Sequence, residues 1–136
     1  MTAITTPRLK ESSDSLLRFA LRADAIASGL MGIAGIALAP WIAETSGTTK
    51  AFEYTMGALF IAFAVGVFAL AARPSVKQTG IVIAAGNVLY TVASVVFVLT
   101  DVFPLTTVGV VSTLAVGVYT LVMAELQYQG VRRVKR

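Results

Sequence analysis

The residues best suited to chemistry are few, and most of them lie inside or beside strongly apolar stretches of the chain. The sequence contains no Cys and no His, which excludes disulfides, thiol catalysis, His-based triads and zinc sites built from these residues. It also shows no glycine-rich phosphate loop, no metal-ligand cluster and no nucleophile beside a base. We therefore predict that the protein is not an enzyme and has no metal or cofactor site.

Polar side chains inside the apolar stretches are the remaining candidates, because burying such groups away from water is costly. Several recur at the i, i+3, i+4, i+7 spacing of one helix face. The candidate polar residues of a bundle interior are Asp24, Ser28, Asn87, Tyr90, Thr91, Ser94 and Glu125. Two interpretations stay open: these groups hydrogen-bond between helices, or they line a polar conduit. We favour packing, since each group then needs only a partner.

Asp24 is the most informative of four carboxylates that flank the apolar stretches, because it heads a stripe of small residues. We expect it to face inwards and to form an ion pair between helices, with Arg22, Arg73 or Lys77 as available partners. None of the four lies at the middle of a stretch, where the coupling carboxylate of a drug or proton antiporter is expected. This placement argues against transport.

Four uncharged apolar stretches must position these groups, and each is long enough to cross a ~30 Å hydrocarbon core as a helix. They cover residues 25–43, 54–72, 80–100 and 105–124. The chain has 136 residues, 57% hydrophobic and 13% charged, with a mean hydropathy of +0.82, which is too apolar for a soluble domain of this size. We predict an all-α polytopic membrane protein, a bundle of four transmembrane helices.

Basic segments flank the predicted transmembrane domain, which spans residues 25–124. Residues 1–24 form an N-terminal segment and residues 125–136 a tail. Within the first segment, Asp14, Arg18 and Arg22 lie four residues apart, which indicates a helix. That helix is either a short amphipathic one at the membrane surface or an extension of the first span.

The positive charges predict the orientation. Four Lys and Arg precede the first stretch, two lie in the middle loop and four follow the last stretch, so ten of the eleven share one side and only Lys50 lies on the other. The positive-inside rule places both termini in the cytoplasm. We attribute the net charge of +4 to this topology and to attraction by anionic lipid headgroups, not to nucleic-acid binding.

Glycines along the apolar stretches predict close helix packing. The candidates are Gly29, Gly32, Gly35, Gly66, Gly109 and Gly117. A glycine that faces lipid weakens its helix and gains no contact, so some of them should mark contacts between chains. We predict a homo-oligomer or a complex with another membrane protein, with the first helix, and Gly32 in particular, at the shared interface.

Two short segments carry a resemblance. Residues 23–29 (ADAIASG) and 124–128 (AELQY), together with Arg73-Pro74 and Asn87, resemble a group of short four-helix integral membrane proteins of actinobacteria and proteobacteria, a group of uncharacterised function. Tyr90 stands where the group has Trp, and the outer loops differ. The resemblance implies a bacterial inner-membrane location and brings no catalytic or ligand-binding assignment.

These observations lead to one functional hypothesis and one alternative. We expect a small non-enzymatic inner-membrane protein, an accessory subunit that self-associates or joins a larger membrane complex. The alternative is an oligomeric transporter or channel for a small solute or ion. A water-filled path lined by Asn87, Thr91 and Ser94 would favour the alternative, whereas a dry interface would favour the accessory role.

Overall fold

The computed structural model describes residues 13–135, and within these residues the chain forms five helices. They are α2 (Ser15–Ala37), α3 (Ala39–Ser46), α4 (Lys50–Ala71), α5 (Lys77–Leu99) and α6 (Thr107–Arg133). All but α3 are long and apolar enough to span a membrane, so the prediction of an all-α chain with four such helices is confirmed. Arg8, Lys10 and Arg136, which contributed to the charge count, lie outside the described residues.

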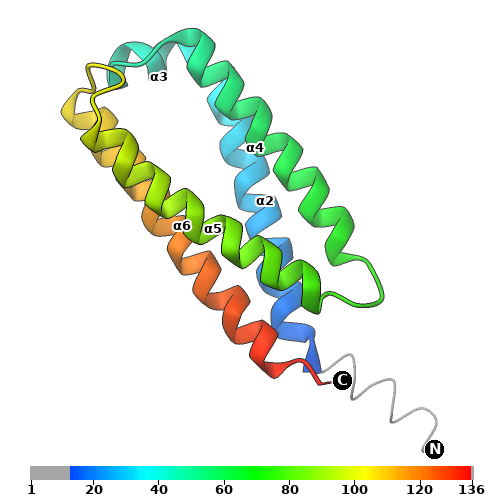
Figure 1. Cartoon of the computed structure of the whole chain (residues 1–136). Helices are drawn as coiled ribbons and strands as arrows, with labels where there is room; N and C mark the ends of the chain where they lie inside the picture. The colour runs from blue at the N-terminus through cyan, green and yellow to red at the C-terminus, as the bar shows by residue number, and fades with distance from the viewer. Residues whose placement is uncertain (1–12, 136) are drawn as a thin grey trace, which may run out of the picture.

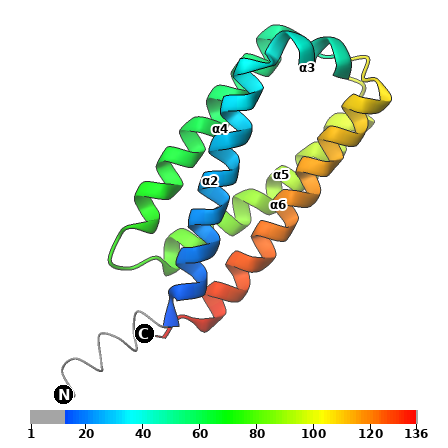
Figure 2. The ribbon, with the colours of Figure 1, turned by 180° about the vertical axis from the view of Figure 1, so that it is seen from behind.

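The four long helices form two antiparallel pairs. α2 packs along α4, and α5 packs along α6, while α2 also joins the second pair by packing against α6. In contrast, α4 and α5 touch very little, although they follow each other in the chain. Figures 1 and 2 show the two pairs meeting near the end that holds the first residues of α2 and the last of α6, with α3 crossing the opposite end.

The first predicted span, residues 25–43, is divided between two helices. α2 runs without a break from Ser15 to Ala37, so the residues before Asp24 extend the same helix. Pro40 occupies the first turn of α3, and a proline there has no N–H to continue the hydrogen bonding of α2. The chain therefore turns at Leu38, and α3 lies across the end of the bundle (Figure 1).

The end of the bundle where α2 begins and α6 ends has a solid apolar core. Its fully buried members come from α2, from the end of α4 and from the loop that follows: Leu17, Leu21, Ala25, Val67, Ala71 and Val76. Arg18 closes this end, because its guanidinium donates to the carbonyl oxygens of Ala71 (2.8 Å), Arg73 (2.7 Å) and Pro74 (2.9 Å). A cation at the C-terminus of a helix also opposes the negative end of its dipole.

At the opposite end, α3 is tied to the start of α6. The Thr106 hydroxyl donates to the carbonyl oxygen of Thr45 at 2.6 Å, and the Thr106 N–H donates to that of Ser46 at 3.0 Å. Gly47 ends α3 with φ 84°, a left-handed conformation that favours glycine. Thr49 and Thr106 cap α4 and α6 by accepting from backbone N–H groups three residues ahead.

The outer surface of the four long helices is strongly apolar. Large side chains stand out on every one of them, including Leu30 (63% exposed), Val65 (66%), Leu89 (68%) and Leu99 (74%). Such a surface is unstable in water and suits the hydrocarbon of a bilayer. The length of the four helices and their apolar outer surface thus both indicate a membrane protein.

Candidate functional site

Asp24 is fully buried, with an exposed fraction of 0%, where α2, α5 and α6 meet. It lies near the middle of α2 (Ser15–Ala37), so the prediction that it stands at the end of a span is corrected. A buried carboxylate is expensive unless hydrogen bonds replace the lost water. Its partners are therefore the first clue to what this part of the bundle does.

Four neutral donors surround the Asp24 carboxylate, two on each oxygen. The Tyr119 hydroxyl (2.7 Å) and the Ser28 hydroxyl (3.1 Å) donate to Oδ1. The side-chain amides of Asn87 (2.8 Å) and Gln127 (2.9 Å) donate to Oδ2. Asn87 Nδ2 also donates to Gln127 Oε1 at 3.0 Å, which joins the two amides to each other. The four bonds match the lone-pair positions of a carboxylate and connect α2, α5 and α6 at one point.

The prediction that Asp24 forms an ion pair between helices is wrong. Among residues 13–135 the one ion pair joins Arg18 to Asp14, and no basic side chain reaches Asp24. Arg22 and Arg73 are exposed, since they lie on the outward side of the bundle. Neutral hydroxyls and amides take the place of a cation, so the site is a polar junction between helices and not a salt bridge.

Two members of this junction, Tyr119 and Gln127, were not among the candidates from the sequence. Gln127 has an exposed fraction of 0% and continues the buried face of α6, three residues after Ala124. That spacing was a usable signal, but residue 127 lies beyond the predicted end of the fourth span. Tyr119 is half-buried and lies beside the buried face of α6, not on it, so its position in the sequence did not mark it as an interior residue.

Glu125, in contrast, does not lie in the interior. Its side chain is exposed and accepts from Gln129 Nε2 at 2.9 Å on the outside of α6. One helical step is about 100°, so Ala124 and Gln127 can face inwards only if Glu125 faces away. The prediction that Glu125 is an interior residue is therefore corrected, with Gln127 in that position.

A second set of polar contacts holds α5 against α6. The Thr91 hydroxyl lies 2.8 Å from that of Thr120 and donates to the carbonyl oxygens of Gly117 (2.9 Å) and Asn87 (3.1 Å). The Ser94 hydroxyl donates to the carbonyl oxygen of Thr91 at 2.7 Å. Within the described residues, Asp14 Oδ1 is the one fully buried side-chain polar atom without a hydrogen-bond partner. The interior polar groups are thus satisfied by the protein itself.

Five of the six candidate glycines do mark helix contacts within the chain. A Cβ atom on Gly32 would lie 2.7 Å from the carbonyl oxygen of Gly57, so α2 and α4 approach backbone to backbone there. The other four also lie against a neighbouring helix: Gly29 against Ala64, Gly35 against Gly57, Gly109 against Ser46, and Gly117 against Ser94. Because Gly32 is buried against α4, it cannot also form the interface between chains that we expected from it.

Gly66 is the exception. It is exposed on α4, and a Cβ atom there would meet nothing within 4 Å. Gly66 therefore does not pack against another helix of this chain, because this side of α4 is turned outwards.

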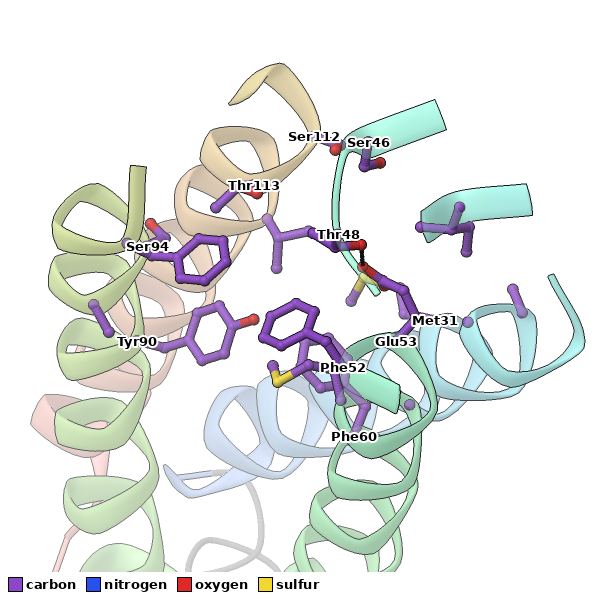
Figure 3. A pocket seen from close by; sticks show the side chains of 18 residues that line it. Met31, Ser46, Thr48, Phe52, Glu53, Phe60, Tyr90, Ser94, Ser112 and Thr113 are labelled. Atoms are coloured by element: carbon purple, nitrogen blue, oxygen red, sulfur yellow. Dashed lines mark hydrogen bonds between the residues drawn. The ribbon is translucent and has the colours of Figure 1, made fainter. Parts of the chain in front are cut away.

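A cavity of about 450 Å³ lies between the two helix pairs, towards the end where α3 crosses. It is lined mainly by apolar and aromatic side chains, with a few polar ones among them. The labelled groups in Figure 3 include Glu53 and Phe60 from α4, Tyr90 and Ser94 from α5, and Thr113 from α6. Of the candidates from the sequence, Tyr90 thus lines a cavity and contacts the Phe60 ring, with 5.7 Å between the ring centroids.

Comparison of the chain with protein-family models, with curated proteins and with solved structures finds no match.

Proposed function

We propose that the chain is a non-enzymatic integral protein of a bacterial inner membrane that acts as an accessory subunit, in association with copies of itself or with a larger membrane protein. The closed polar interior carries this proposal. Asn87 and Gln127 are only 5% and 0% exposed, and Thr91 is bonded to α6, whereas Ser94 borders the cavity. A dry interface of this kind supports a packing role, whereas a permeation path needs polar groups that are open to water.

The outward side of α4 supports association with another helix. Ala58, Ala62 and Gly66 are all exposed and lie four residues apart, so they form one stripe along the helix. Helices in lipid gain little from apolar burial, and small residues allow the close backbone contact that holds them together. Gly66 on a surface that met only lipid would weaken α4 and gain nothing. We therefore assign the shared interface to α4 instead of α2.

The proposed orientation has both termini and the α4–α5 loop in the cytoplasm. The start of α2, the end of α6 and the α4–α5 loop lie at the same end of the bundle (Figure 1). Arg18 and Arg22 belong to the first turns of α2, Arg73 lies in the α4–α5 loop and Lys77 begins α5. Positive charges are retained on the cytoplasmic side, and they attract the anionic headgroups of that leaflet. The resemblance of residues 23–29 and 124–128 to bacterial membrane proteins supports the location in an inner membrane.

Cysteine cross-linking tests this proposal cleanly, because the chain has no native Cys. Gly66→Cys places a thiol in open space on the α4 stripe, and oxidation of native membranes should yield a covalent dimer in a self-associating protein. Val122→Cys is the matched control: it is 52% exposed, lies on α6 and sits at a similar helical depth. The control should stay monomeric.

A heteromeric complex would give a different result in the same experiment. Gly66→Cys would then form no dimer, while affinity isolation in mild detergent would recover a second protein in fixed proportion, and Gly66→Leu would release it. If neither variant affects association and the purified chain makes vesicles permeable to small ions, the accessory role is wrong and the transport alternative replaces it.

A further inference from the structure

The cavity between the helix pairs has the size and the position of a ligand site. Small-molecule sites typically occupy about 300–1,000 Å³, and the cavity of about 450 Å³ lies within this range. It occupies the region where α4 and α5 stand apart, so that aromatic pairs bridge them. The Phe52 and Phe97 rings stack with centroids 5.3 Å apart, and the Phe60 and Tyr90 rings meet edge to face.

The charge of this cavity comes from Glu53. Its carboxylate lies in the first turn of α4, accepts a hydrogen bond from the Thr48 hydroxyl and lines the cavity (Figure 3). No basic side chain of residues 13–135 pairs with it, and Lys50, one turn earlier, is exposed and does not line the cavity. A negative charge without a cation therefore faces a mainly apolar space.

Tyr90 provides a second polar group that is open to a ligand. Its ring lines the cavity from α5, and its hydroxyl points towards the middle of the space (Figure 3). This hydroxyl forms no hydrogen bond with any of the described residues. It can donate to or accept from a molecule that enters.

The remaining lining suits a positive charge on an apolar body. Phe52, Phe60, Phe97 and Tyr90 contribute aromatic rings, whose π-electrons attract cations, and Met31 and Met56 add polarisable sulfur atoms. An anion would meet the Glu53 carboxylate without any basic group to offset it. The residues that line the cavity thus favour a cation over an anion.

We propose that this cavity binds a small organic cation with an apolar body, such as a substituted ammonium, with Glu53 as its counter-ion and the aromatic rings around it. This site is separate from the α4 stripe assigned to association, since Ala58, Ala62 and Gly66 do not line the cavity. The two proposals can therefore fail independently.

Calorimetric titration of the purified full-length chain in detergent tests the proposal with benzyltrimethylammonium, a quaternary cation whose charge does not depend on pH. Neopentylbenzene has the same shape without the charge, and phenylacetate carries the opposite charge. We expect the cation to bind at least tenfold more tightly than either comparison compound. Equal binding of the neutral compound would mean that the cavity is merely an apolar space for lipid or detergent, and would overturn the proposal.

The variants Glu53→Gln and Glu44→Gln remove the same charge at the same end of the molecule. Glu44 is exposed on α3 and does not line the cavity, so its variant should bind the cation like the wild type. Glu53→Gln should weaken binding at least tenfold, and Tyr90→Phe by severalfold. If Glu53→Gln does not fold, the charge comparison on the wild type still decides the question. Undiminished binding by Glu53→Gln, or no binding of the cation by the wild type, would contradict the assignment.

Discussion

Substitution of Asp24 by Asn examines the polar junction with the smallest change in shape. In the wild type, two hydroxyls donate to Oδ1 and two amides donate to Oδ2. In the variant, one of these oxygens becomes an NH2 group, which faces two donors and can accept from neither. The bundle then loses up to two hydrogen bonds to a buried charged group.

The expected loss of stability is about 1–3 kcal/mol. Hydrogen bonds to charged groups contribute about 1.5–3 kcal/mol each, so two of them set an upper range of about 3–6 kcal/mol. Two effects reduce this figure: the amide of Asn87 or Gln127 can turn to offer its oxygen, and the variant no longer buries a charge. Asp24→Leu should cost more, because it leaves all four donors without an acceptor.

The assay is reversible unfolding in detergent followed by circular dichroism of the helices, with the free energy of unfolding compared between variants. Glu125→Gln makes the same chemical change on an exposed side chain and should alter stability by less than about 0.5 kcal/mol. A stability of Asp24→Asn equal to that of the wild type would refute the structural role of the four hydrogen bonds.

Further predictions concern individual contacts and the topology. Tyr119→Phe removes one donor at 2.7 Å and should lower the free energy of unfolding by about 1–2 kcal/mol in the same assay. Arg18→Met removes three hydrogen bonds to the last residue of α4 and to the loop that follows it, and should destabilise the protein measurably, whereas Arg22→Met, at an exposed position, should not. Gly32→Leu should abolish the folded state, seen as loss of a monodisperse peak in size-exclusion chromatography, because α2 could no longer approach α4. A C-terminal reporter that is active only after export should stay inactive, and activity would contradict the cytoplasmic terminus.

The sequence predicted the four long helices well, because lipid leaves the backbone few alternatives and the apolar stretches are uninterrupted. It missed the division of the first span at Leu38, although Pro40 was a signal for it. The polar candidates on α2 and α5 were found, since Ser28 and Asn87 lie inside apolar stretches where polar residues are conspicuous. Both contact Asp24.

The partners of those candidates were harder to predict. The charge of Asp24 suggested a cation, but which of several nearby groups reaches it depends on the rotation of α6, and a sequence does not give that rotation. The same rotation decides between Glu125 and Gln127, and the rotation of α4 turns Gly66 outwards. The cavity could not be predicted either. Glu53 and Tyr90 line a common space only because α4 and α5 stand apart, and the sequence does not give the distance between two helices.

Native mass spectrometry of the affinity-isolated protein, released from its own membranes in mild detergent, tests the accessory role most directly. A single chain has a mass of 14.3 kDa. An accessory subunit should appear at a multiple of this mass, or in a complex with a second protein in fixed proportion, and Gly66→Leu should shift the population towards the single chain. A wild-type spectrum that contains only the 14.3 kDa species would contradict the accessory role.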